Sequence, residues 1–195
     1  MTAIIDYNTG NLFSLISALE RVGADYRLTS DPEEILSADS VILPGVGEAS
    51  NAMSELRNRG LDQVIPLIKV PVLGICIGMQ LMCSSSEEGN TECLGIFPNK
   101  VLKLKGKGIK IPHMGWNSIA NTRSPLFAGI EEVAYFYFVH SFAPECNEFT
   151  AATTEYGELF SSALYKNNFY GTQFHPEKSG EMGERLLRNF IKIKI

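Results

Sequence analysis

The first 76 residues alternate strand-like segments with segments of helical periodicity, and this alternation restricts the possible folds more than any other feature of the sequence. Strand-like runs occupy residues 3–6, 25–29, 40–47 and 70–76, and helical patterns follow each of them. Chains that alternate in this way form a parallel sheet with helices on both faces. Most of these runs are apolar almost throughout, as expected for a sheet that is covered on both sides. We therefore predict an α/β fold with an open, mostly parallel central sheet.

The second half of the chain has a different pattern. Five strand-like segments separated by turns lie at 101–105, 135–142, 150–156, 159–165 and 169–175. An amphipathic helix follows over 179–192, and we expect Ser179 to cap its first turn. A length of 195 residues suits one domain, and no linker or repeat divides the chain. Residues 1–195 are therefore predicted to form a single domain.

Composition excludes several classes of function. The net charge of −5 argues against a nucleic-acid groove, which needs a clustered basic face. The longest uncharged stretch, residues 70–86, is too short to cross a bilayer, and the chain does not open with a basic leader, so we expect a cytoplasmic protein. Cys76, Cys83, Cys93 and Cys146 show neither a disulfide framework nor metal-ligand spacing. We expect free thiols and no metal site.

Cys76 lies in the pattern G-x-C-x-G, between Gly74 and Gly78, where a predicted strand passes into a predicted helix. Small residues flank a nucleophile where the backbone turns too sharply for neighbouring side chains. Such a turn exposes the sulfur at a helix N-terminus, which favours the thiolate, and directs the N–H of Ile77 beside it. The alternative is a structural cysteine buried in a packed strand.

A cysteine nucleophile needs a base, and His175 is the best placed of the three histidines. His113 and His140 read as hydrogen-bonded structural histidines. His175 ends a predicted strand in Q-F-H-P-E, and residues two apart on an extended chain point to the same side, which places Glu177 beside it. Pro176 stiffens the spacing, and a carboxylate there orients the imidazole. The alternative is a turn with an exposed glutamate.

The segment P-G-V-G, residues 44–47, ends the strand that precedes the one carrying Cys76. Both turns are expected to open at the carboxyl edge of the sheet, where α/β sheets bind ligands. Gly45 and Gly47 allow backbone N–H groups to face that edge and to stabilise an oxyanion. A plain strand-to-helix turn is the alternative reading.

Together, P-G-V-G (44–47), G-I-C-I-G-M-Q (74–80) and H-P-E (175–177) resemble the motifs of the class I, or triad, glutamine amidotransferases. The resemblance implies a flavodoxin-like fold whose central sheet is mostly parallel but mixed. It also implies that Cys76 attacks the glutamine amide, that His175 transfers protons and that Glu177 orients His175. The implied oxyanion and substrate contacts are Gly45, Val46, Gly47, Ile77, Gln80, Glu88, Ser141 and Phe142. Phe142 stands where tyrosine is common in the family.

Four further segments, 6–12, 112–117, 137–142 and 169–180, resemble one group within this family more closely. Its members are separate glutaminase subunits that supply ammonia to a (βα)8-barrel cyclase subunit in histidine biosynthesis. The resemblance implies a heterodimer with such a cyclase, glutamine as substrate, and no cofactor or metal. Candidate interface residues are Asn11, Trp116, Asn117 and Tyr137.

The sequence leaves other readings open. A paralogue that delivers ammonia to a sugar-amidinating enzyme would carry the same glutaminase motifs. A stand-alone γ-glutamyl hydrolase would use the same Cys/His/Glu chemistry without a partner. A non-enzymatic thiol sensor would need Cys76 but neither His175 nor Glu177. For Gln80 and Glu88, the alternative to a substrate contact is a solvent-facing helix.

Overall fold

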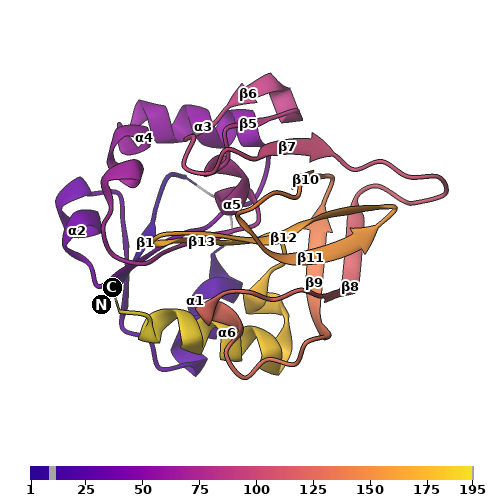
Figure 1. The fold of residues 1–195 in the computed structure, drawn as a ribbon. Helices are drawn as coiled ribbons and strands as arrows, with labels where there is room; N and C mark the ends of the chain where they lie inside the picture. The colour runs from indigo at the N-terminus through magenta and orange to yellow at the C-terminus, as the bar shows by residue number, and fades with distance from the viewer. Residues whose placement is uncertain (9–11, 195) are drawn as a thin grey trace.

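A computed structural model describes residues 1–8 and 12–194 of the chain (Figure 1). Within these residues a central sheet of seven strands has the order β11-β12-β13-β4-β3-β1-β2. Its strands are β1 (Thr2–Ile5), β2 (Tyr26–Thr29), β3 (Ser40–Leu43), β4 (Val72–Ile75), β11 (Thr150–Tyr156), β12 (Glu158–Lys166) and β13 (Phe169–Thr172). The five strands from β13 to β2 are parallel, whereas β12 pairs antiparallel with β11 and with β13. The predicted mixed, mostly parallel sheet is confirmed.

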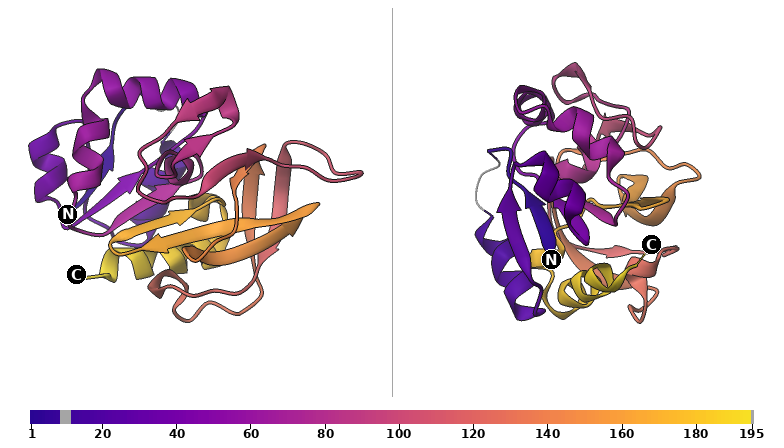
Figure 2. Two further views of the ribbon diagram at one scale, coloured as in Figure 1. Left: turned by 45° about the horizontal axis from the view of Figure 1, so that its top comes forward. Right: turned by 90° about the vertical axis from the view of Figure 1, so that its left-hand side faces the viewer.

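Helices cover both faces of this sheet, as predicted. The helices are α1 (Phe13–Arg21), α2 (Pro32–Ser37), α3 (Ala49–Asn58), α4 (Leu61–Val64), α5 (Ile77–Leu81) and α6 (Gly180–Lys192). Figures 1 and 2 show α1 and α6 on one side of the strands, with α3, α4 and α5 on the other. The amphipathic α6 buries Leu186, Leu187 and Phe190 against the sheet side.

A smaller sheet and a hairpin complete the described part of the chain. The smaller sheet has the order β10-β7-β5-β6, formed by β5 (Ser85–Ser86), β6 (Thr91–Glu92), β7 (Lys100–Lys103) and β10 (Phe142–Pro144). In the hairpin, β8 (His113–Ile119) pairs antiparallel with β9 (Ala134–His140). Short 3-10 turns are η1 (Ile65–Leu67), η2 (Glu88–Asn90), η3 (Pro125–Phe127) and η4 (Pro176–Lys178). No helix in the described ranges is long and apolar enough to cross a membrane.

The structure differs in detail from the expected elements at three points. The helical pattern that follows residues 40–47 is interrupted at Gly60, whose φ of 67° is left-handed and ends the helical ladder before α4. Ser179 precedes α6, but its side chain does not cap that helix; it donates to the His175 carbonyl and accepts from the Tyr137 N–H. Strand β8 was missed, because its polar residues interrupt the apolar alternation that marks a strand.

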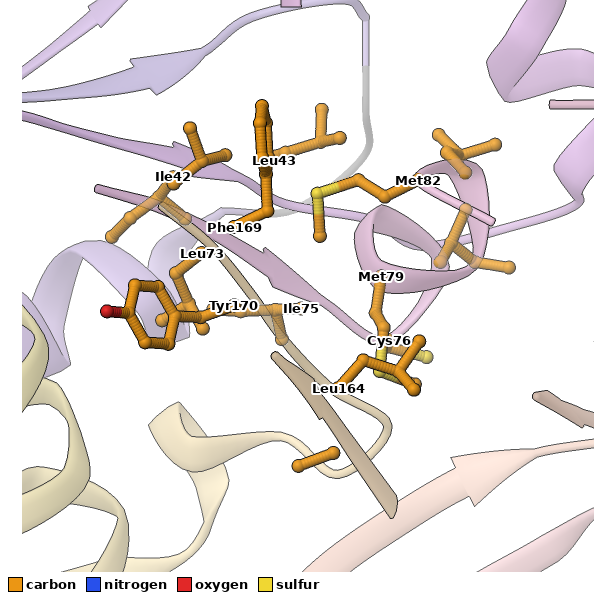
Figure 3. Packing of buried hydrophobic residues seen from close by; sticks show 14 of the residues in the cluster. Ile42, Leu43, Leu73, Ile75, Cys76, Met79, Met82, Leu164, Phe169 and Tyr170 are labelled. Carbon is orange, nitrogen blue, oxygen red and sulfur yellow. The ribbon is translucent and has the colours of Figure 1, made fainter. Parts of the chain in front are cut away.

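The core places α5 directly over the middle of the sheet. Figure 3 shows Met79 of α5 and Met82, which directly follows α5, against the strands that carry Leu43 and Ile75. These side chains are buried almost completely. The strand β4 and the helix that follows it are therefore held rigidly together, and the junction between them is Cys76.

Candidate active site

Three neighbouring parallel strands end at one cavity. The strands β3, β4 and β13 lie side by side, so their carboxyl ends meet at the same edge of the sheet. The cavity there has a volume of about 330 Å³ and is lined by Gly45, Val46, Gly47, Cys76, Ile77, Gln80, Glu88, Pro112, Val139, His140, Ser141, Phe142, His175 and Lys178. Of the predicted site residues that the structure describes, Glu177, Trp116, Asn117 and Tyr137 do not line this cavity.

Cys76 occupies a strained backbone conformation between β4 and α5. Its φ of 51° and ψ of −109° are unusual for a residue with a side chain, and α5 begins at the next residue. The Cys76 N–H donates to the Thr172 carbonyl at 2.7 Å, and the Cys76 carbonyl accepts from the Gln80 N–H at 3.1 Å. The sulfur is not on the open surface, contrary to the expectation, because Cys76 is only 5% exposed and lies at the wall of the cavity.

The glycines near Cys76 are required by close backbone packing. A Cβ on Gly78 would lie 1.9 Å from the Leu43 carbonyl oxygen, and one on Gly45 would lie 2.3 Å from the Gly78 nitrogen. A Cβ on Gly74 would lie 2.7 Å from the Gly78 carbonyl carbon. The three glycines therefore let the turn after β3 touch the first turn of α5, which brings Gly45 beside Cys76.

His175 and Glu177 form a direct hydrogen bond. The Nδ1 atom of His175 lies 2.7 Å from Oε1 of Glu177, and both side chains are nearly buried. The contact is made by a 3-10 turn, η4, that starts at Pro176, and not by the extended chain that the sequence suggested. Nε2 of His175 has no hydrogen-bond partner among the described residues. That nitrogen is therefore available for a proton transfer in the cavity.

Electrostatics favour a protonated His175. Burial alone lowers the pKa of His175, but negative charge at Cys76 together with the hydrogen bond and the charge of Glu177 raises it more, to a net value of about 10. The site thus holds an imidazolium close to the Cys76 sulfur. Such a pair combines a nucleophile with a proton donor.

The other two histidines form a buried structural pair. His113 Nδ1 lies 2.9 Å from His140 Nε2, and His140 Nδ1 lies 2.9 Å from the Phe142 carbonyl oxygen. Burial lowers the pKa of His113 to about 4 and that of His140 to about 3, so both rings are neutral at physiological pH. This arrangement agrees with the structural reading of both residues.

Gln80 and Glu88 both reach the cavity, so the alternative of a solvent-facing helix is wrong for Gln80. Gln80 is 1% exposed, and its Nε2 donates to the Phe142 carbonyl and to Gln173 Oε1, each at 2.9 Å. Its Oε1 is buried with no partner in the described part of the chain. Glu88 accepts from the Ala49 N–H at 2.8 Å, yet burial outweighs this bond and raises the pKa of its carboxyl.

The predicted interface residues lie on the hairpin, apart from Asn11, which is outside the described residues. Trp116 is 57% exposed and packs edge-on against the half-buried Tyr137, with ring centroids 6.3 Å apart. Asn117 is directed inward, and its Nδ2 contacts His113 and the Glu155 carbonyl.

Sequence reasoning missed several residues at the site. Val139 and Lys178 line the cavity, and the Val139 carbonyl lies 3.9 Å from the Cys76 sulfur. Tyr7 donates to the Pro44 carbonyl at 2.6 Å and so anchors the turn after β3. Gln173 donates from Nε2 to the Cys76 sulfur at 3.6 Å. All four residues lie in segments that the family resemblance singles out, 6–12, 137–142 and 169–180, and Gln173 also lies in the Q-F-H-P-E segment that carries His175.

The chain is similar to known proteins over nearly its whole length. The family model described as "Glutamine amidotransferase class-I" matches residues 3–193. A Bacteroides fragilis protein named imidazole glycerol phosphate synthase subunit HisH is 52% identical over 193 residues, covering 98% of each chain. A Shewanella loihica protein of the same name is 46% identical over 202 residues, covering 98% of this chain and 90% of the relative. Among solved structures, a Thermoplasma acidophilum protein described as a GMP synthase subunit superposes with a TM-score of 0.76 at 21% identity, covering 98% of this chain and 92% of that one.

Proposed function

The chain belongs to the class I glutamine amidotransferases, and from this premise we propose that it is the glutaminase subunit of an imidazole glycerol phosphate synthase. In this role it hydrolyses glutamine and passes the ammonia to a cyclase subunit, which forms imidazole glycerol phosphate and aminoimidazole carboxamide ribotide. The observation that carries the proposal is the convergence of Cys76, His175 and the Gly45–Gly47 turn on one cavity.

The first half of the proposed reaction forms a thioester. The Cys76 thiolate attacks the side-chain carbonyl carbon of glutamine, and the negative charge moves to the carbonyl oxygen. Ile77 is the first residue of α5, so its backbone N–H has no acceptor within the helix. This N–H is suited to donate to the carbonyl oxygen, together with N–H groups of the Gly45–Gly47 turn. His175 then gives its Nε2 proton to the departing nitrogen, the C–N bond breaks and ammonia leaves.

The second half hydrolyses the thioester. The now neutral His175 takes a proton from water, and the resulting hydroxide attacks the thioester carbon. The C–S bond breaks, which releases glutamate and the Cys76 thiolate while the remaining proton passes to solvent. Glu177 holds Nδ1 of His175, which keeps Nε2 directed at the reacting atoms in both halves.

We assign recognition of the α-amino and α-carboxylate groups of glutamine to the polar groups that line the cavity besides Cys76 and His175. Glu88 offers a carboxylate to the substrate ammonium, and the unpartnered Oε1 of Gln80 offers a further acceptor. Ser141 and Phe142 complete this wall. A buried polar atom without a partner is costly, so a ligand that supplies a donor to Gln80 Oε1 is favoured.

The change Glu177→Gln is expected to lower kcat for glutamine hydrolysis by about 10²- to 10⁴-fold, because the imidazole loses the carboxylate that orients it. Glu177 is one of the groups that raise the pKa of His175 to about 10. Removing its charge lowers that pKa, so the alkaline loss of activity moves to lower pH. Steady-state rates of the full chain measured from about pH 6 to 10.5, a range that brackets this pKa, test both effects.

Glu181→Gln provides the matched control, because Glu181 is an exposed carboxylate in the first turn of α6. It is expected to leave both kcat and the pH profile unchanged. If Glu177→Gln loses its activity at the same alkaline pH as the wild type, the role given to Glu177 is wrong.

The outer face of the hairpin is the surface we assign to the cyclase partner, a (βα)8 barrel. This hairpin face consists of Met114, Trp116, Tyr135, Tyr137 and Val139. Met114, Trp116 and Tyr135 are each more than half exposed, and aromatic residues and methionine are enriched in protein interfaces. Val139 pairs with Met114 and also lines the cavity, so a protein docked on this face covers the place where ammonia is released.

The proposed function is tested by mixing the full chain with the candidate cyclase and the nucleotide substrate of that cyclase. Glutamine-dependent formation of imidazole glycerol phosphate is expected only in the complete mixture. Trp116→Ala is expected to weaken binding of the cyclase by about 30-fold, since exposed tryptophans are frequent hot spots. Isothermal titration of the two proteins measures this change.

Leu67→Ala is the control for Trp116→Ala, because Leu67 is similarly exposed but lies on η1, away from the hairpin face. It is expected to bind the cyclase like the wild type. If Trp116→Ala and Leu67→Ala bind the cyclase equally well, the hairpin face is not the docking surface. If no imidazole glycerol phosphate forms in the complete mixture, the proposed function itself is wrong.

A further inference from the structure

Gln173 lies directly beside the nucleophile because of the strand register. In the parallel pair β13–β4, Thr172 is opposite Ile75, so the next residues, Gln173 and Cys76, are neighbours. The Cys76 N–H bonds to the Thr172 carbonyl, which continues the ladder to this point. Nε2 of Gln173 lies 3.6 Å from the Cys76 sulfur, and Gln173 is completely buried.

The direction of this hydrogen bond follows from the chemistry of its neighbours. The Phe142 carbonyl only accepts hydrogen bonds, so the end of the Gln80 amide that faces it at 2.9 Å is the NH₂ group. The second N–H of the same group donates to the side chain of Gln173, also at 2.9 Å, so Gln173 presents its oxygen there. The NH₂ group of Gln173 must therefore face the sulfur.

The histidine pair holds the other end of this chain of hydrogen bonds. The Phe142 carbonyl also accepts from Nδ1 of His140, whose Nε2 in turn faces Nδ1 of His113. Nε2 of His113 lies 3.3 Å from Nδ2 of Asn117. Both rings are neutral, so each uses one nitrogen as a donor and the other as an acceptor. Every group between Asn117 and Cys76 thus has a single consistent orientation.

We propose that Gln173 is a further catalytic residue, whose side-chain N–H stabilises negative charge on the Cys76 sulfur. The sulfur carries that charge before it attacks and again when the thioester breaks. A hydrogen bond to an ionised acceptor is stronger than one to a neutral group, so the Gln173 N–H favours the charged sulfur over the neutral one. The bond between Gln80 and Gln173 prevents the amide from turning its oxygen toward the sulfur. For glutamine turnover the inference rests on the proposed function, but the stabilised thiolate is measurable without glutamine.

The test is the rate at which iodoacetamide alkylates Cys76 in the full chain, followed by peptide mass spectrometry. Gln173→Met removes the donor, and Gln173→Glu removes it while keeping an acceptor for Gln80. Both variants are expected to alkylate Cys76 about tenfold more slowly near neutral pH, and the difference is expected to shrink as the pH rises, because the thiolate is the reactive form. Cys146 is exposed and serves as an internal standard in each sample.

Gln63→Met is the matched control, because Gln63 is an exposed glutamine on α4. It is expected to alkylate Cys76 at the wild-type rate. In the glutaminase assay, Gln173→Glu is expected to lower kcat about tenfold with little change in KM, as for a group that acts on the reacting atoms. Wild-type alkylation of Cys76 by either folded Gln173 variant near neutral pH overturns the inference. Slower alkylation in a chain that hydrolyses no glutamine would uphold the inference and reject the proposed function.

A measurement on the wild-type chain covers the case in which neither variant folds. The side-chain NH₂ resonances of Gln173 are expected to shift in ¹⁵N spectra when Cys76 is alkylated, whereas those of Gln63 stay in place. Unshifted Gln173 resonances would show that its N–H does not contact the sulfur, which contradicts the proposal.

Discussion

Cys76→Ser is expected to lower glutamine hydrolysis by about 10⁴-fold or more. Loss of the nucleophile from a catalytic triad removes the whole covalent route, and its cost is of this size or larger in enzymes of the same logic. Serine keeps the shape of the side chain, but its hydroxyl is a far weaker acid than a thiol. Residue 76 must adopt the same strained φ of 51° in the wild type and in the serine variant, so the free energy of unfolding is expected to change little. Glutamate release in the complete mixture with the cyclase measures the effect.

Cys146→Ser is the control for this change, because Cys146 is an exposed free cysteine outside the cavity. It is expected to retain full activity. Undiminished hydrolysis by Cys76→Ser would reject the thioester mechanism. A thiol sensor, by contrast, would lose its response with Cys76 but would not depend on Glu177, so the Glu177→Gln rates separate the two readings.

Gly78→Ala is expected to cause a large loss of stability. The new Cβ would lie 1.9 Å from the Leu43 carbonyl oxygen and 2.8 Å from its carbon, and both are backbone atoms that cannot rotate away. Adding a methyl group to a close-packed interior costs typically about 1–3 kcal/mol, and a backbone clash places this variant at about 3 kcal/mol or more. For a chain of this size, that lowers Tm by roughly 6–12 °C in a thermal unfolding experiment.

Gly108→Ala separates this clash from the general effect of a lost glycine. Gly108 has a φ of 81°, but no atom lies within 4 Å of the position of its Cβ. It is expected to lose only about 1 kcal/mol, the cost of the left-handed backbone. Gly78→Ala is also expected to lose glutaminase activity at temperatures where it is folded, because β3 must move away from α5 and takes Gly45 with it. Equal stability of the two variants would contradict the packing argument.

The local sequence pattern was enough to predict which strand ends meet at the site. The alternation of strands and helices implies parallel pairing, and parallel strands place their carboxyl ends at one edge. That rule alone brought the Gly45 turn and Cys76 to the same cavity. The pairing of His175 with Glu177 was also predictable, although the chain reaches it through the 3-10 turn that Pro176 begins.

Several features were decided by contacts between segments that are far apart in the sequence. The helical period alone did not indicate that Gln80 is buried, because its partners Phe142 and Gln173 lie 62 and 93 residues away. Likewise, Gly78 looked like part of a turn, whereas its Cβ is excluded by Leu43 on another strand.

The sequence by itself therefore determined which residues stand at the carboxyl edge of the sheet, since periodicity and strand direction are local properties of the chain. Only the tertiary structure decided how those residues are oriented. The register of β13 on β4 sets Gln173 against the Cys76 sulfur, and the hairpin places His140 against His113. Orientation depends on the packing of many distant side chains at once, and no local pattern records it.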